Sequence, residues 1–132
     1  MNEDNKKLIK EAEKTRKRAY TPYSKFNVGA AILTTDGKIF TGCNIENASF
    51  GLTICAERVA IFKAISEGSS KFKAIAIVGD TEQPCSPCGS CRQVISEFSE
   101  DIEVIMSNLK GDIKIKKLFE LLPEAFSMKD IL

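Results

Sequence analysis

The sequence predicts a single α/β domain over residues 1–132, and three observations lead to that class. The first is composition, because 132 residues with 43% hydrophobic and 28% charged side chains suffice for one soluble globular core. The second is the apolar run Ala74–Val78, which is typical of a strand covered on both faces. The third is a strand–helix–strand–helix–strand order after an initial helix and hairpin, which implies parallel strands with right-handed crossovers and helices packed on the sheet.

The N-terminal part is predicted to form a helix followed by a hairpin. Good helix formers run through Asp4–Tyr20, and Pro22 ends this helix because the residue before a proline avoids the α region. Two strands follow at Phe26–Thr34 and Lys38–Asn44. Between them, Asp36-Gly37 is a turn signal typical of a hairpin.

The rest of the chain supplies the alternation of helices and strands. Residues Cys55–Glu67 predict a helix, with Gly68 as its C-terminal stop. The remaining predicted elements are the strands Ala74–Val78, Ile102–Met106 and Ile113–Lys116, the helix Cys88–Phe98 and a helical turn at Leu118–Leu122.

Charge and hydropathy exclude several classes of partner. The 19 basic and 18 acidic residues leave a net charge of +1, which gives no field that favours nucleic acid or a membrane surface. The longest apolar stretch is far too short to span a bilayer, and the N-terminus carries no apolar signal segment. The basic run Lys14–Arg18 is typical of a solvated helix face. We therefore expect a cytoplasmic protein that binds neither nucleic acid nor membrane.

Five cysteines and no histidine indicate a metal site built on thiolates or carboxylates. An odd number of cysteines in a chain expected to be cytoplasmic argues against a disulfide framework. Cys55, Cys88 and Cys91 each stand at the start of a predicted helix, where the helix dipole favours the thiolate. Three thiolates with a fourth position open suit a catalytic zinc, whereas a structural zinc has four closed ligands.

The second cysteine pair has two possible registers. Cys88 and Cys91 share one face of a helix start, but Cys85 and Cys88 have the same spacing. Pro87 at the mouth of the helix favours Cys88 and Cys91. Cys85 is then a bystander, or the fourth ligand of a structural site. Cys43, at a strand end, is interpreted as a small core residue.

Two charged residues follow Cys55 at positions that suit zinc chemistry. Glu57 is expected off the metal-binding face, within reach of a zinc-activated water that needs a proton shuttle. Arg58 could donate hydrogen bonds to a thiolate and draw charge from an over-anionic zinc centre, with Arg92 as the alternative. In the absence of a metal, Glu57 and Arg58 would be an ordinary solvated helix surface, although adjacent residues do not face each other.

Several motifs in the right order resemble those of zinc nucleoside deaminases, and of the bacterial-type, three-cysteine cytidine deaminases in particular. Cys55-Ala56-Glu57 followed by Pro87-Cys88-Gly89-Ser90-Cys91 matches the zinc signature and favours the Cys88 and Cys91 register. The resemblance implies a three-layer α/β/α fold with a five-stranded mixed sheet, one zinc ion per subunit and a homotetramer. The further segments that carry it are Tyr23–Phe26, Gly42–Ala48, Cys88–Ile95 and Leu121–Phe126.

The resemblance also implies roles for residues that, judged singly, are ordinary loop or core residues. Asn44 and Glu46 are expected to hydrogen-bond the ribose hydroxyls, and Phe26 to pack on the pyrimidine. Neighbouring subunits are expected to complete each site through the segment Ala48–Phe50 and the C-terminal aromatic Phe126. The full set of expected substrate contacts is Phe26, Asn44, Glu46, Ala48, Phe50, Ala56 and Phe126.

The implied reaction is hydrolytic deamination of cytidine and deoxycytidine to uridine and deoxyuridine plus ammonia, in pyrimidine salvage. Glu57 would take a proton from the activated water, deliver it to N3 of the base and pass a proton to the departing amino group. The alternatives are a deaminase of a nucleoside antibiotic such as blasticidin S, a polynucleotide-editing deaminase and, from a different class, a structural zinc module that binds a partner. The ribose-binding pair Asn44 and Glu46 argues against the antibiotic deaminase. The balanced charge argues against the polynucleotide-editing deaminase, which needs a basic channel for the strand. The structural zinc module would leave Glu57 without a function.

Overall fold

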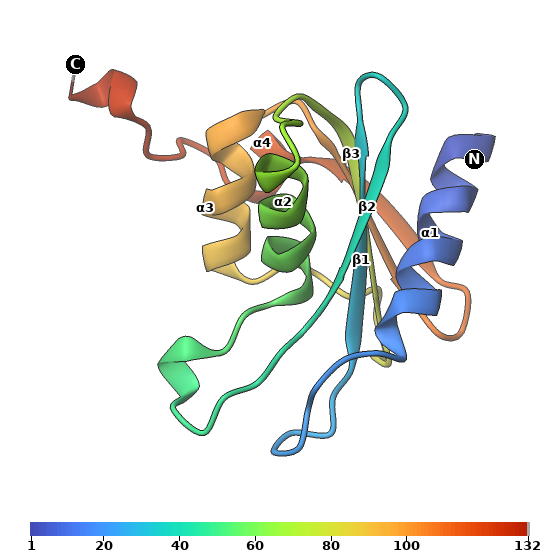
Figure 1. The fold of residues 1–132 in the computed structure, drawn as a ribbon. Coiled ribbons are helices and arrows are strands. Elements are labelled where there is room, and N and C mark those ends of the chain that lie inside the picture. The colour runs from blue at the N-terminus through green and yellow to red at the C-terminus, as the bar shows by residue number, and fades with distance from the viewer. Residues whose placement is uncertain (132) are drawn as a thin grey trace.

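The computed structural model describes residues 1–131 and is organised around one five-stranded mixed sheet (Figure 1). The strands lie in the order β2-β1-β3-β4-β5, and only β3 and β4 pair in parallel. Because β2 and β3 both run antiparallel to β1, the two helical crossovers each join strands of the same direction, as predicted. The strands are β1 (Val28–Thr34), β2 (Ile39–Cys43), β3 (Phe72–Gly79), β4 (Glu103–Asn108) and β5 (Ile113–Lys117).

Helices cover both faces of this sheet. Helix α1 packs on one face, and α2 and α3 pack on the other, which gives the expected three layers (Figure 1). The C-terminal segment then extends away from the body of the molecule (Figure 1). The helices are α1 (Glu3–Arg16), α2 (Ala56–Ser66), α3 (Gly89–Phe98) and the short α4 (Leu118–Leu121), with 3₁₀ turns at Phe50–Leu52 and Met128–Asp130.

The central strand β3 divides its side chains between the two halves of the core. Ile75 and Ile77 join the cluster under α2 and α3, while Ala74, Ala76 and Val78 join the cluster under α1. Alternate residues of a strand point to opposite faces, so a strand covered on both sides must be apolar throughout. The prediction made from this apolar run is confirmed.

The first predicted helix, Asp4–Tyr20, is wrong at its C-terminal end. Helix α1 ends at Arg16, and Tyr20 forms a β-bridge with Ile45. The Tyr20 backbone N–H donates to the carbonyl of Asn44 at 3.0 Å. Helix propensity is a weak preference, and this long-range pairing overrides it. The pairing joins the segment after α1 to the segment after β2.

The other elements form where they are predicted, and only their first or last residues differ. Cys55 and Cys88 are N-cap residues with extended backbone, so each precedes its helix. Strand β3 is longer than its apolar run because Phe72 also pairs with β1. Besides these two cysteines, the predicted end residues that lie outside their elements are Phe26, Asn27, Lys38, Asn44, Glu67, Ile102 and Leu122.

Gly42 sets the distance between β2 and α2, the helix that follows Cys55. A Cβ atom at this position would lie 2.5 Å from both the Ala56 carbonyl oxygen and the Ala60 nitrogen. Both are backbone atoms and cannot rotate away. We expect Gly42→Ala to lower the free energy of unfolding by about 1–3 kcal/mol, measured by urea denaturation. Gly51→Ala is the matched control, because a Cβ atom there meets nothing within 4 Å; equal stability of the two variants would contradict this packing.

Candidate metal centre and active site

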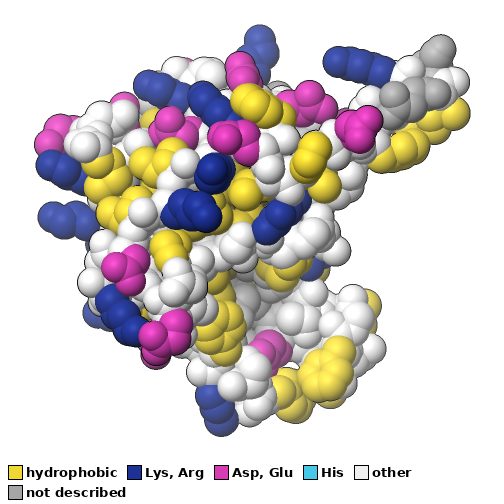
Figure 2. Space-filling model, turned by 180° about the vertical axis from the view of Figure 1, so that it is seen from behind, with side chains coloured by type: hydrophobic (Ala, Val, Ile, Leu, Met, Phe, Trp, Pro, Cys, Tyr) yellow, Lys and Arg dark blue, Asp and Glu magenta, His cyan; other side chains and the backbone are white. Residues whose placement is uncertain are grey.

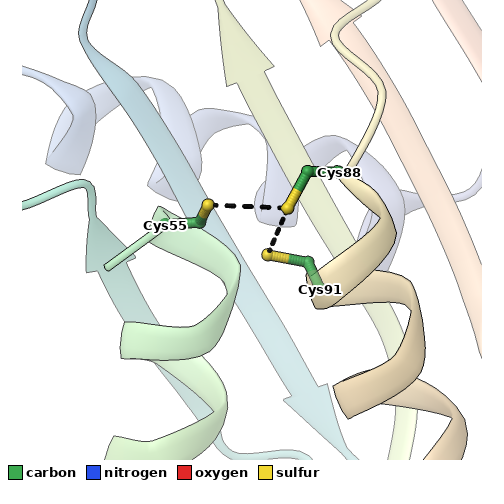
Figure 3. Close-up of side chains that lie close together, drawn as sticks. All are labelled: Cys55, Cys88 and Cys91. Carbon is green, nitrogen blue, oxygen red and sulfur yellow. Dashed lines mark hydrogen bonds between the residues drawn. The ribbon is translucent and has the colours of Figure 1, made fainter. Parts of the chain in front are cut away.

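Two helix N-termini converge on three cysteines. Cys55 is the N-cap of α2, Cys88 is the N-cap of α3, and Cys91 lies in the first turn of α3. The Cys88 sulfur is 3.7 Å from that of Cys55 and 3.5 Å from that of Cys91 (Figure 3). Neither N-cap thiol caps its own helix. The three sulfurs point toward one common point instead (Figure 3).

The spacing of these sulfurs fits a tetrahedral zinc ion. Zinc–sulfur bonds of about 2.3 Å at tetrahedral angles place the sulfur atoms about 3.8 Å apart. The three ligand atoms all lie within 4.8 Å of one another. Cys91 is buried whereas Cys88 is exposed, so the cluster is open to solvent on one side. Three thiolates with one accessible position are the arrangement of a catalytic zinc site.

Cys85 lies outside this cluster. Its sulfur packs against Gly79, where an added Cβ atom would approach it to 2.9 Å, and the side chain belongs to the core under α2 and α3. Burial raises the pKa of the Cys85 thiol to about 11, as expected for a cysteine enclosed by apolar side chains. Among the described residues, the metal-ligating group therefore comprises Cys55, Cys88 and Cys91. The register ambiguity is resolved in favour of Cys88 and Cys91.

Hydrogen bonds around the sulfurs favour ionisation at Cys55. The thiol of Cys91, the Arg58 side chain and the thiol of Cys88 lower the pKa of Cys55 to about 5, against a partial opposing effect of burial. The same thiol pairing raises the pKa of Cys91. Arg58 Nη2 donates to Cys55 Sγ at 3.5 Å. An arginine thus lies against a predicted metal thiolate.

Glu57 is buried beside the cluster. It lies in the first turn of α2, two residues after Cys55, and its exposed fraction is only 4%. Burial, followed by the charge of Cys55, raises the pKa of the Glu57 carboxyl to about 7. A buried carboxyl group with a shifted pKa next to a metal site is a candidate proton carrier.

The loop that carries Phe26 is held by Asn44. The Asn44 amide donates to the Phe26 carbonyl at 2.8 Å, and its oxygen accepts from the Val28 N–H at 2.9 Å. The Phe26 ring lies next to Gly79 at the end of β3, and the residue is 39% exposed. Asn44 therefore fixes the loop that presents this ring.

Glu46 holds the neighbouring part of the same loop. Its carboxylate accepts from the backbone N–H groups of Tyr23 and Ser24, at 2.9 and 3.1 Å, and from the Ser24 hydroxyl. The Ser24 hydroxyl is the main cause that lowers the pKa of Glu46. Glu46 also lines a pocket of about 410 Å³ with Tyr23, Ser24, Phe50 and Thr53. Figure 2 shows the surface hollowed between these lower loops and the body of the molecule.

The remaining predicted contact residues differ in exposure. Ala56 is fully buried at the start of α2. Ala48 and Phe50 are exposed, and the Phe50 ring packs edge-on against Tyr23 with ring centroids 6.3 Å apart. Phe126 is 61% exposed on the C-terminal segment. Phe50 and Phe126 thus present their rings at the surface of this single chain.

Comparison with known proteins identifies the family. The model of the cytidine and deoxycytidylate deaminase zinc-binding region matches residues 2–107, which include all three clustered cysteines. The chain belongs to this deaminase family. Cys55, Cys88 and Cys91 are accordingly its zinc-binding site.

Relatives in this family match over nearly the whole chain. A cytidine deaminase of Sporosarcina psychrophila is 57% identical, over 97% of this chain and 95% of the relative. A cytidine deaminase of Halalkalibacterium halodurans is 54% identical, over 97% and 98% of the two chains. The blasticidin-S deaminase of Bacillus cereus is 34% identical, over 76% of each.

The fold also superposes closely on a solved structure of a family member. The crystal structure of a cytidine deaminase from Burkholderia pseudomallei superposes with a TM-score of 0.90 at 49% identity, covering 96% of this chain and 100% of that one. The expected cytidine-deaminase fold with a five-stranded mixed sheet is therefore confirmed. Within residues 1–131, no helix has both the length and the apolar character needed to cross a membrane.

Two features of the site are absent from the sequence prediction. Ser24 lies in the Tyr23–Phe26 motif, but the sequence did not predict its hydrogen bonds to Glu46, which is 22 residues further along the chain. Arg92 was expected, at most, to contact a sulfur, whereas its donors bind three oxygen atoms. No local spacing signals such pairs, because their partners meet only in the folded chain.

Proposed function

We propose that this chain catalyses the hydrolytic deamination of cytidine and 2′-deoxycytidine to uridine and 2′-deoxyuridine, with release of ammonia, in pyrimidine salvage. The observation that carries the proposal is a buried Glu57 beside three zinc-binding thiolates that leave one position open. Two relatives with more than half of their residues identical over almost the full chain are cytidine deaminases, which supports the same reaction here.

Glu57 is the proton carrier in this proposal. Zinc, when bound, supplies a Lewis acid that makes a water molecule nucleophilic near neutral pH. Glu57 accepts a proton from the attacking water and donates it to N3 of the base, which makes C4 electrophilic. After the oxygen adds to C4, Glu57 transfers the second water proton to the amino group, and the C4–N bond breaks to release ammonia. Burial of Glu57 keeps bulk water from competing for these protons.

The loops around Asn44 and Glu46 bind the nucleoside in this proposal. Glu46 presents its carboxylate at the pocket, where ribose hydroxyls can replace or join the Ser24 hydroxyl as donors. Asn44 holds Phe26, whose partly exposed ring packs on the pyrimidine. Ala56 is fully buried at the start of α2, directly after Cys55, and its contact with the base stays a prediction from the family resemblance.

The assembly is proposed to be a homotetramer that shares its active sites. Phe50 and Leu52 are 76% and 65% exposed, an unusual exposure for large apolar residues in an isolated chain. Ala48, Phe50 and Phe126 would then complete sites of neighbouring subunits. Light scattering coupled to size-exclusion chromatography should give four times the 14.5 kDa chain mass; a monomeric mass would contradict this assembly.

A substrate panel tests the proposed reaction. Zinc-loaded protein is incubated with cytidine, deoxycytidine, cytosine, CMP and blasticidin S, and ammonia is measured. We expect turnover of the two nucleosides and little or none of the other three, because Asn44 and Glu46 are proposed to bind the ribose of a free nucleoside. Turnover of blasticidin S alone would favour the antibiotic deaminase. Stoichiometric zinc with no turnover would favour the structural zinc module.

We also propose that the protein acts in the cytoplasm on free nucleosides, without nucleic acid or membrane partners.

Arg58 is proposed to moderate the charge of the zinc centre. Its Nη2 atom donates to the Cys55 sulfur, which withdraws electron density from a centre that carries three thiolates. We expect Arg58→Gln to lower kcat by about 10–100-fold, because partners of metal ligands have effects of this size. Steady-state kinetics on cytidine measure it. Arg18→Gln, on an exposed residue after α1, is the control. A normal kcat in Arg58→Gln would remove this role.

A further inference from the structure

Arg92 directly follows Cys91 and uses its guanidinium group to bind three oxygen atoms. Nε donates to the Pro87 carbonyl at 2.9 Å, and Nη2 donates to the Ser86 hydroxyl at 2.9 Å. Nη1 donates to the Leu121 carbonyl at 2.8 Å. Hydrogen bonds from a charged donor are stronger than neutral ones, and a planar guanidinium holds its acceptors in a fixed geometry.

The first two bonds bracket the zinc-binding pair. Pro87 immediately precedes Cys88, and Arg92 immediately follows Cys91, so the side chain links both ends of the segment that supplies two thiolates. Within the same turn, the Arg92 N–H also donates to the Cys88 carbonyl at 3.0 Å. Cys88 itself is exposed and has no capping bond that would fix its side chain. The Arg92 side chain therefore restrains the loop that places the Cys88 sulfur.

The third bond anchors this restraint to another element. Leu121 is the last residue of α4, which begins at the fully buried Leu118. Gln93, the next residue of α3, adds a bond from its Nε2 to the Phe126 carbonyl at 2.9 Å. The start of α3 is thus attached to the C-terminal segment at two points, while Arg92 reaches back to the loop before Cys88.

We propose that Arg92 is a positioning residue of the zinc site, which holds Cys88 at the distance from Cys91 that zinc requires. This role differs from that of Arg58, because all three hydrogen bonds of the Arg92 guanidinium group go to oxygen atoms rather than to sulfur. The inference uses the zinc site itself and rests on the proposed deamination only for its kinetic readout.

Zinc release and cobalt spectra test the role directly. Full-length Arg92→Gln, loaded with zinc, is mixed with a chromophoric chelator, and we expect release at least about 10-fold faster than from wild type. Its cobalt-substituted form should show an altered thiolate-to-cobalt charge-transfer band. Ser86→Ala removes one acceptor and should release zinc at an intermediate rate. Arg92→Lys should resemble Arg92→Gln, because one ammonium group cannot serve three acceptors in this geometry.

The controls separate positioning from simple stabilisation of the fold. Arg18→Gln should leave both readouts unchanged, and urea unfolding of the metal-free variants measures stability alone. If Arg92→Gln lowered only the unfolding free energy, with wild-type zinc release and cobalt spectrum, the positioning role would be wrong. With cytidine, we expect kcat to fall and KM to change little. If the wild-type protein deaminated nothing, the proposed function would fail while the zinc and cobalt measurements still decided the role of Arg92.

Discussion

Replacing Glu57 with glutamine is expected to lower kcat for cytidine by about 10²–10⁴-fold, because the amide cannot carry protons between the water, N3 and the leaving amino group. Glutamine nearly matches the shape of glutamate, so the buried position beside Cys55 should still be filled. Zinc content should therefore remain that of wild type, and KM should change little. Single-turnover kinetics and metal analysis of the same sample measure both quantities.

The control for this variant lies on the same helix. Glu67, the exposed C-cap of α2, is at the end remote from the cysteines, and Glu67→Gln should deaminate cytidine at the wild-type rate. If Glu57→Gln turned over cytidine near normally while holding zinc, Glu57 would not be the proton carrier. Loss of zinc in this variant would instead assign Glu57 to the stability of the metal site.

Replacing Cys88 with serine is expected to weaken zinc binding by more than about 100-fold, because even partners that merely orient metal ligands contribute 10–100-fold. The protein should lose zinc on dialysis, and cytidine turnover should fall with it. Metal analysis after dialysis against a weak chelator provides the measurement. The spacing of the three sulfurs predicts the same outcome for Cys55→Ser and Cys91→Ser.

Cys85→Ala is the matched control for the thiolate variants. Cys85 has the same spacing from Cys88 as Cys91 does, but its thiol is buried against Gly79 outside the cluster. This variant should keep one zinc ion per chain and its activity, with only a modest loss of stability from the smaller side chain. Loss of zinc from Cys85→Ala, with zinc retained by Cys91→Ser, would reverse the ligand assignment.

The layers of the fold could be predicted because their signals are local. The apolar run of β3, the Asp36-Gly37 turn and the proline and glycine residues around helices each act within a few residues. The end of α1 could not be predicted in this way. Residues 17–20 are good helix formers, but the Tyr20–Ile45 bridge removes them from the helix, and that bridge depends on a loop formed later in the chain.

The zinc ligands could also be predicted from local signals. The hydrogen bonds that hold the surrounding loops could not. Cys88 and Cys91 share a helix start, and Cys55 stands two residues before Glu57, so short motifs report them. The bonds of Glu46 to Ser24 and of Arg92 to Leu121 join distant segments and leave no periodicity in the sequence. Sequence reasoning assigned Glu46 a ribose contact, whereas the fold shows that it also holds the loop that forms the pocket.

The most direct test of the account is the initial rate of uridine formation from cytidine as a function of zinc bound per chain. Zinc-free protein is prepared with a chelator and titrated with zinc, and rate and bound metal are measured on the same samples. We predict a rate that rises in proportion to bound zinc and reaches its maximum at one ion per chain. Full zinc occupancy without uridine formation, or a rate independent of zinc, would contradict the assignment of Cys55, Cys88, Cys91 and Glu57 to a cytidine-deaminating centre.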